Sequence, residues 1–163
     1  LGWIWYISRL VAIIAAAFLI TTAGVRGFSY MKAYFGNGYE DYKNGELVYS
    51  ADSGYETLIY DMHLKIDGVR YYDDGTLELR YKTWKSLFSD SIDWTFNLNG
   101  ESFTDEKGNK YYFSTGNSNG NKVCHSQLFF EDFPQDVKTI IIDTDVNGQN
   151  IHCEIPVPEV NNK

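Results

Sequence analysis

The sequence has few of the residues that usually mark an enzyme or a metal centre. Its 163 residues include two cysteines and three histidines, with no G-x-S-x-G nucleophile motif and no cysteine in a reactive setting. It also lacks an N-x-S/T glycosylation motif, so no motif in the sequence indicates a eukaryotic secretory route. We therefore predict that the chain is not an enzyme and holds no cofactor.

Acidic residues are missing from the first part of the chain. Residues 1–32 carry a charge of +3 from Arg9, Arg26 and Lys32, whereas the rest of the chain holds all 22 acidic residues against 11 basic ones. A domain this acidic is repelled by phosphate backbones and by anionic lipid headgroups. The sequence therefore predicts a domain that binds no nucleic acid and does not lie flat on a membrane.

The N-terminal segment contains the long apolar run of the sequence. Sixteen uncharged, mostly apolar residues separate Arg9 from Arg26, and as a helix they would span about 24 Å of a hydrocarbon core roughly 30 Å thick. Residues 3–7 can extend this span. We predict that residues 1–27 form a transmembrane helix or signal anchor, which contacts the lipid bilayer through residues 3–25. A signal peptide cleaved near Thr22-Ala23-Gly24 and a buried core helix are the alternatives.

The orientation of this helix is not fixed by its flanking charges. Arg26 and Lys32 lie on the domain side and Arg9 on the other, so the positive-inside rule alone does not place the domain outside. We expect the domain outside because it is acidic, is placed like the domain of a signal-anchor protein, and has two cysteines that can be matched to each other. The prediction is a single-pass protein of the cell membrane with its domain outside the cytoplasm.

Residues 28–55 are rich in tyrosine and are interrupted by four glycines. We interpret them as a stalk whose aromatic side chains pack against the base of the domain rather than as a platform for a ligand. From Glu56 the apolar residues alternate with polar ones up to Ile66, which predicts one half-buried strand. In that strand Leu58, Tyr60 and Met62 would share a face.

Further strand-like runs follow at intervals that are typical of an antiparallel β-sandwich. They cover residues 69–72, 77–84, 92–98, 110–115, 122–130, 137–145 and 150–157, and no long helical pattern appears after residue 56. Turn dipeptides such as Asn99-Gly100 and Asn147-Gly148 separate some of them. The domain is predicted over residues 56–160, with residues 161–163 as a tail. The predicted core consists of Trp84, Trp94, Phe96, Phe113, Leu128, Phe130, Ile140 and Ile142.

Three stretches of the domain carry a resemblance to a known group of proteins. They are FTDEKGNKYYF (residues 103–113), LFFEDFPQDVKTIIID (128–143) and NGQNIHCEIPVP (147–158). Residues 56–160 thereby resemble the immunoglobulin-like extracytoplasmic domains that follow a single span in Gram-positive bacterial membrane proteins, some of them anti-sigma-factor-like regulators. The resemblance implies an all-β, antiparallel, immunoglobulin-like β-sandwich after one N-terminal transmembrane helix.

Both cysteines stand next to histidines, as Cys124-His125 and His152-Cys153. Adjacent residues in a strand point to opposite faces, so neither pair can offer both side chains to one zinc ion. If Asn147-Gly148 forms a two-residue turn, Cys153 lies opposite Ile142 on the apolar face. We predict a disulfide between Cys124 and Cys153, which would close a loop of about 30 residues. Two buried free thiols are the alternative.

The stretch DTDVNGQNIHCE, residues 143–154, matches the calcium-loop pattern D-x-[DN]-x-[DN]-G-x5-E. A helix-loop-helix calcium site needs a helix on each side of the loop. The β-branched run before Asp143 and the prolines after Glu154 favour strands instead. We therefore predict a β-hairpin without a dedicated metal site. A weak calcium site at Asp143, Asp145 and Asn147 is the alternative.

These features predict a membrane-tethered extracytoplasmic binding or sensing module that is not catalytic. Its partners would be the lipid bilayer and a protein that the sequence does not identify. Two other functions are open at this point. The chain could be a structural accessory domain of a larger membrane assembly, or a secreted β-sandwich domain after signal-peptide cleavage.

Overall fold

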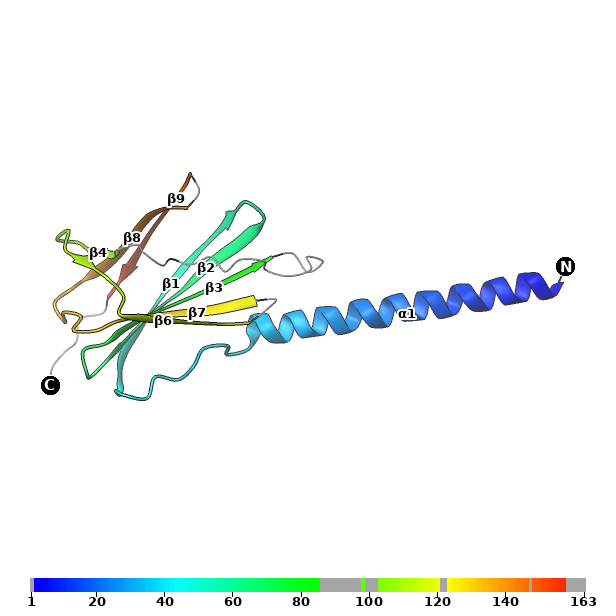
Figure 1. Ribbon diagram of the computed structural model, residues 1–163, viewed down its shortest axis with the longest axis horizontal. Helices are drawn as coiled ribbons and strands as arrows, with labels where there is room; N and C mark the ends of the chain where they lie inside the picture. The colour runs from blue at the N-terminus through cyan, green and yellow to red at the C-terminus, as the bar shows by residue number, and fades with distance from the viewer. Residues whose placement is uncertain (1, 86–97, 99–102, 121–122, 147, 158–163) are drawn as a thin grey trace. The chain divides into compact units, whose positions relative to one another are not determined.

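The structure is a computed structural model that describes residues 2–85, 98, 103–120, 123–146 and 148–157 (Figure 1). The chain divides into two compact units, one up to Asn37 and one from Gly38 onward. The predicted strand at residues 92–97, the Asn99-Gly100 turn, and the predicted core residues Trp94 and Phe96 lie outside the described residues.

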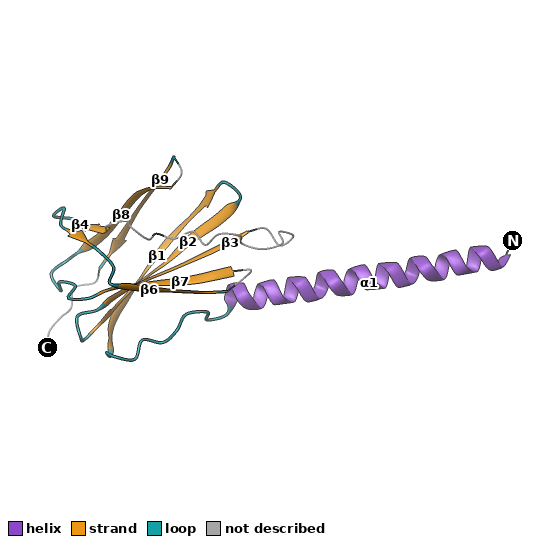
Figure 2. Cartoon of the chain, in the orientation of Figure 1, coloured by secondary structure: helices purple, strands orange, loops and turns teal. Residues whose placement is uncertain are grey.

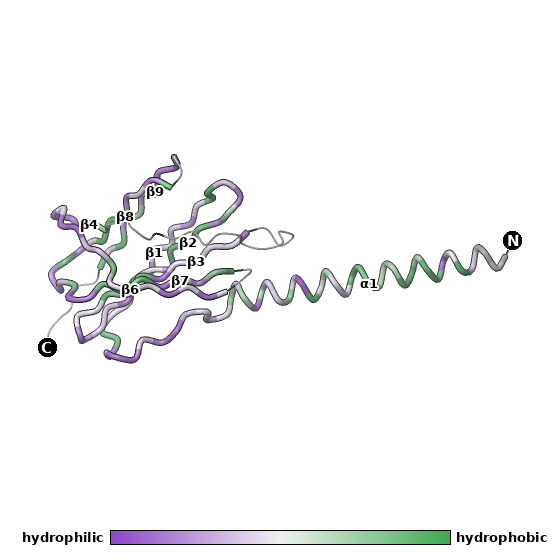
Figure 3. The backbone as a smooth tube through the Cα atoms, in the orientation of Figure 1, coloured by the Kyte–Doolittle hydropathy of each residue, from purple (hydrophilic) through white to green (hydrophobic). Residues whose placement is uncertain are grey.

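The first unit is a single α-helix, α1 (Gly2–Phe35, 34 residues). Most of its residues are apolar, as Figure 3 shows, and its segment Trp5–Phe35 is long and apolar enough to cross a membrane. At 1.5 Å per residue the helix is about 51 Å long, so it exceeds the roughly 30 Å of a hydrocarbon core. It continues eight residues beyond the predicted boundary at residue 27 and ends where the Gly36 amide donates to the Lys32 carbonyl (2.8 Å).

The second unit is built from two antiparallel β-sheets (Figure 2). The five strands of the first, which we call sheet A, are β1 (Leu47–Ile59), β2 (Met62–Tyr72), β3 (Leu77–Lys85), β7 (Val123–Phe130) and β6 (Thr115–Asn119), in that spatial order. The four strands of sheet B are β5 (Lys110–Tyr111), β4 (Phe103–Asp105), β8 (Thr139–Val146) and β9 (Gln149–Pro156). The prediction of an antiparallel β-domain after an apolar helix is confirmed.

The two sheets share one hydrophobic core. Sheet A contributes alternate residues of β2, β3 and β7, and sheet B contributes alternate residues of β8 and β9. The rings of Phe103 in sheet B and Phe130 in sheet A are 5.0 Å apart. The predicted core residues that lie in this cluster are Leu128, Phe130, Ile140 and Ile142, with Phe113 packed against it. Trp84 is buried on the opposite face of sheet A, where its ring stacks on His63 at 5.0 Å.

The single strand predicted from Glu56 to Ile66 is wrong, because the chain turns back within it. Tyr60 and Asp61 form a two-residue turn, and Ile59 pairs with Met62. Tyr60 has a φ of 56°, which supplies the positive φ that such hairpin turns use. Ile59 is therefore fully buried and Leu58 is 50% exposed, the reverse of the predicted alternation. Apolar and polar residues alternate in the sequence with the same period of two before and after the two-residue turn. This pattern alone therefore did not reveal the turn.

The segment predicted as a stalk, residues 28–55, divides into three parts. Its first residues complete α1, and those from Leu47 belong to β1. Between them, residues 38–46 form neither helix nor strand. We call residues 38–46 the strap, because they lie against the face of sheet A that points away from the core.

Candidate functional site

The strap covers a polar cluster that β3 and β7 present on the outer face of sheet A. Side chains alternate along a strand, so Leu79 on β3 enters the core while its neighbours Glu78 and Arg80 face outward. Arg80 pairs with Gln127 on β7. We call Glu78, Arg80 and Gln127 the clasped cluster. All three are buried, at 0%, 5% and 1% exposure, although they lie on the outer face.

The carboxylate of Glu78 is surrounded by donors. Its Oε1 accepts hydrogen bonds from Arg80 Nε (2.5 Å) and from Gln127 Nε2 (2.6 Å). Its Oε2 accepts from Arg80 Nη2 (3.1 Å) and from the Tyr72 hydroxyl (2.5 Å). Charge-assisted bonds of this kind are about twice as strong as neutral ones. The buried charge is thereby both paired and hydrogen-bonded, which a charge at this depth requires.

Gln127 joins the clasped cluster to the backbone of the strap. Its Nε2 donates to the Glu40 carbonyl (2.8 Å), and its Oε1 accepts from the Glu40 amide (2.9 Å). One side-chain amide thus satisfies both backbone groups of a single strap residue, as a neighbouring strand would. The contact is made to the backbone of Glu40 and does not depend on the Glu40 side chain.

Two tyrosines of the strap lie on either side of this backbone contact. The Tyr39 hydroxyl donates to Asp67 (2.6 Å), and the Arg80 guanidinium lies 4.9 Å from the centre of the Tyr39 ring, a cation–π contact. The Tyr42 hydroxyl donates to Asp74 (2.6 Å). The Tyr42 ring contacts the rings of Tyr72 (4.5 Å between centroids) and Phe129 (5.5 Å).

The end of the strap is fixed by a reciprocal pair of hydrogen bonds. The Glu46 amide donates to Asp73 Oδ1 (2.8 Å), and the Asp73 amide donates to the Glu46 carbonyl (3.0 Å). Glycine is needed where the strap first meets the sheet. A Cβ on Gly38 would lie 2.3 Å from Cδ2 of the His125 ring, so a side chain at this position would push the strap away.

The surroundings keep the tyrosines of this site protonated. Burial, together with the hydrogen bond to Asp67, raises the pKa of Tyr39 far above its usual range. Burial and the hydrogen bond to Glu78 raise the pKa of Tyr72 to about 12. Both hydroxyls therefore act as donors to carboxylates at physiological pH. The strap is thus held by the rings and hydroxyls of two tyrosines and by the backbone amide and carbonyl of Glu40.

Sequence reasoning missed this site. The alternation in β3 places Glu78 and Arg80 on the face away from the core, and no residue of β3 or β7 signals that a segment from before β1 lies over that face. The pair Tyr39 and Tyr42 in a glycine-rich segment was the available signal. Both tyrosines pack on the domain, which agrees with their interpretation as packing residues. They lie on the outer face of sheet A, however, and not at the base of the domain.

The predicted disulfide is absent, because Cys124 and Cys153 are both buried free thiols. Cys124 lies on β7, where its sulfur is 2.7 Å from the Ser118 hydroxyl on β6. Cys153 lies on β9, which contacts the edge strand β1 of sheet A. Strand β7 is three strands from β1, about 14 Å at the usual spacing. A disulfide needs the two Cα atoms within about 7 Å.

The hairpin predicted at residues 143–154 is confirmed by the pairing of β8 with β9. Asp143 pairs with His152, Ile142 with Cys153, and Val146 with Gln149. Asn147 lies outside the described residues. Asp145, one of the two carboxylates named as weak calcium ligands, accepts a hydrogen bond from the Gly148 amide (2.7 Å) and so stabilises the turn.

His152 lies between two carboxylates on the exposed face of this hairpin. Its Nδ1 is 3.5 Å from Asp143 Oδ2, and its Nε2 is 3.4 Å from Glu154 Oε1. All three side chains are more than half exposed. Exposed pairs of this kind contribute little to stability.

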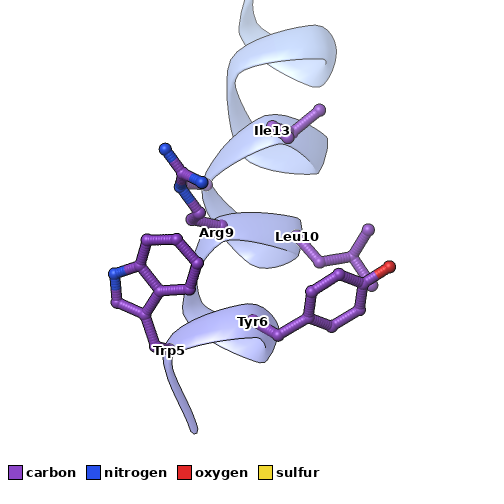
Figure 4. A pocket seen from close by; sticks show the side chains of 6 residues that line it. Trp5, Tyr6, Arg9, Leu10 and Ile13 are labelled. Carbon is purple, nitrogen blue, oxygen red and sulfur yellow. The ribbon is translucent and has the colours of Figure 1, made fainter. Parts of the chain in front are cut away.

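At the N-terminal end of α1, Trp5 lies beside Arg9, and Tyr6 lies beside Leu10 (Figure 4). The Arg9 guanidinium lies 4.2 Å from the centre of the Trp5 ring, and Tyr6 projects beside Leu10. Trp5 and Tyr6 are 60% and 64% exposed. Side chains of these types gather at the boundary between hydrocarbon and headgroups in membrane proteins.

Comparisons of the chain with protein-family models, with curated proteins and with solved structures each found no match.

Proposed function

We propose that the protein is a membrane-tethered extracytoplasmic binding or sensing module. Helix α1 anchors the chain in the bilayer, and the acidic domain from Gly38 onward works outside the cytoplasm as an immunoglobulin-like β-sandwich. The observation that carries this proposal is that an exposed apolar helix of 34 residues precedes a separately folded, acidic two-sheet domain.

Two features of the helix support the anchoring role: its apolar side chains are exposed, and arginines stand on both sides of its apolar segment. Ile13, Phe18 and Ile20 are exposed at 66%, 68% and 72%, and burying such side chains in lipid removes this apolar surface from water. Arg9 with Trp5 suits one boundary of the bilayer, and Arg26 lies far enough along the helix to suit the other. The helix would then extend beyond the bilayer towards the domain.

The domain supports a recognition role rather than a catalytic one. Its most elaborate polar site, the clasped cluster, reads backbone and aromatic groups and leaves the Glu78 carboxylate fully occupied by donors. A general base or nucleophile needs a free lone pair next to the substrate. The contacts of this site are those of binding.

Two measurements on cells that express the full chain test the proposal. Extraction with alkaline carbonate should leave the chain in the membrane pellet, because α1 is buried in lipid. Protease added to intact cells should digest the domain and leave α1 protected. A chain released by carbonate, or a domain that is digested only after the cells are permeabilised, would overturn the proposal. Release of a product that starts near Val25 would instead identify a cleaved signal peptide.

A further inference from the structure

We propose that the outer face of sheet A is a binding site for an extended peptide, which the strap of the same chain occupies as a releasable internal ligand. The ligand class follows from the strap itself. The face recognises an extended segment with tyrosines at positions i and i+3, here Tyr39 and Tyr42, and a backbone amide pair between them. This inference rests on the recognition role in the proposed function and not on membrane tethering, so its failure would leave the membrane-tethered, extracytoplasmic part of the proposed function standing.

The first step is that the contacts of the strap are those of a bound peptide rather than of a core element. Tyr39, Glu40 and Tyr42 are held by Asp67, Gln127 and Asp74, each through a polar side chain of sheet A or of the turn between β2 and β3. Three positions of the strap thus have separate contacts with the domain. Peptide-binding domains use the same division between backbone hydrogen bonds and pockets for alternate side chains.

The second step is that the covered face tolerates water. The centre of the covered face is charged or polar, since Glu78 and Arg80 pair with each other and Gln127 has an amide that water can satisfy, whereas Tyr42 packs on the aromatic rings of Tyr72 and Phe129. A buried ion pair regains hydration when it is exposed, which offsets much of the interaction that is lost. The strap therefore opens at a lower cost than a segment that covers an apolar surface.

The third step is that the hydrophobic core does not depend on the strap. The core cluster lies on the other face of sheet A and contains no residue of the strap. Proteins open in separate cooperative units of different stability, and segments with few buried apolar contacts belong to the least stable ones. The strap can detach while the two sheets remain folded, and an extended peptide can then take its place.

Binding in trans is tested with the full chain in detergent micelles and a fluorescent peptide of residues 37–47. Tyr39→Ala/Tyr42→Ala in the chain weakens the strap in cis, and Tyr112→Ala is the matched control, because the Tyr112 side chain is 69% exposed. The peptide should bind the double variant saturably, at least tenfold more tightly than the control and the unchanged chain. In these two the tethered strap competes at a high effective concentration. A peptide with both tyrosines replaced by alanine should not bind.

Absence of peptide binding to a folded double variant, or equal binding to all three chains, would overturn the proposal. Hydrogen exchange on the unchanged chain decides the matter even if the double variant does not fold. The amides of Glu40 and Glu46 should exchange at least tenfold faster than the paired amides of β3, because the strap opens on its own. Exchange of strap and β3 amides in one common opening would show that the strap is an inseparable part of the fold and would refute the inference.

Discussion

The side-chain amide of Gln127 on β7 makes two hydrogen bonds with the backbone of Glu40 in the strap, one as donor (2.8 Å) and one as acceptor (2.9 Å). The same amide donates to Glu78 (2.6 Å). Gln127 thus connects a buried charge in the sheet to the segment that leads from the domain to helix α1. This connection makes the strap a defined part of the domain's surface.

Removal of this connection should destabilise the domain measurably. In Gln127→Ala the Glu40 backbone groups and one Glu78 oxygen lose partners in a buried site, which should cost about 2 kcal/mol in the free energy of unfolding. The matched control is Gln149→Ala, because Gln149 donates to the Leu58 carbonyl at an exposed site (2.9 Å). We expect the control to cost less than about 0.5 kcal/mol. Urea denaturation of the two variants measures both values, and equal losses would contradict the role given to Gln127.

The buried ion pair should respond far more strongly to neutralisation than an exposed one. Glu78→Gln leaves the Arg80 guanidinium buried without a carboxylate, which should cost about 3 kcal/mol or more. Glu154→Gln removes the charge that lies beside His152 at an exposed site and should change the free energy of unfolding by less than about 0.5 kcal/mol. The double variant Glu78→Gln/Arg80→Met should be more stable than the sum of the single losses predicts. Additive losses in thermal denaturation would show that the two charges do not interact.

Acid should weaken the domain partly through Asp105 at the end of β4. Burial raises the pKa of this carboxyl group, but hydrogen bonds from Asn109, Tyr111 and Lys107 outweigh it and lower the pKa from 3.8 to about 2. A depressed folded-state pKa stabilises the fold above about pH 4, and this contribution is lost as the pH falls towards 2.

Asp105→Asn should therefore lower stability at pH 7 by about 1 kcal/mol and flatten its decline between pH 4 and pH 2. Asp52→Asn, at an exposed position on β1, serves as the control and should keep the steep decline of the unchanged chain. Denaturation midpoints across this pH range provide the measurement. If stability declined between pH 4 and pH 2 as steeply in Asp105→Asn as in the unchanged chain, Asp105 would not contribute to the acid sensitivity.

The thiol of Cys153 should be unreactive in the folded protein. Burial raises its pKa to about 11, so the reactive thiolate is scarce at pH 8. Maleimide added at pH 8 should label neither cysteine in the native chain and should label both once the chain is unfolded in guanidinium, as intact mass would show. A chain that takes up no label even when unfolded and unreduced would contain a disulfide, which contradicts the positions of the two cysteines.

Local patterns in the sequence predicted the parts of this structure that depend on neighbouring residues. The apolar run predicted a helix, and Asn147-Gly148 between alternating segments predicted the pairing of Asp143 with His152, which the structure has. Patterns that repeat across a turn were less informative. Tyr60 and Asp61 reverse the chain although the turn contains no glycine. The alternation of apolar and polar residues in the sequence continues through them, so it did not reveal the turn.

The features that failed depend on which strands are neighbours in space. The hairpin register correctly placed Cys153 on the apolar face, and Cys124 is buried too, but burial does not tell which side of the core each occupies. Glu78 and Arg80 alternate with core residues, which places them on the outer face of sheet A. That face is buried because Tyr39 and Tyr42, more than 30 residues earlier in the chain, fold back over it.

The central claim, an anchored helix with the acidic domain outside the cytoplasm, is tested most directly by labelling single cysteines in intact cells. In a chain with Cys124→Ala and Cys153→Ala, one variant carries Tyr112→Cys in the domain and another Trp3→Cys before the span; both side chains are exposed, at 69% and 81%. We predict that a membrane-impermeant maleimide labels Tyr112→Cys in intact cells and labels Trp3→Cys only after permeabilisation. Labelling of Trp3→Cys alone in intact cells would place the domain inside and contradict the proposed function.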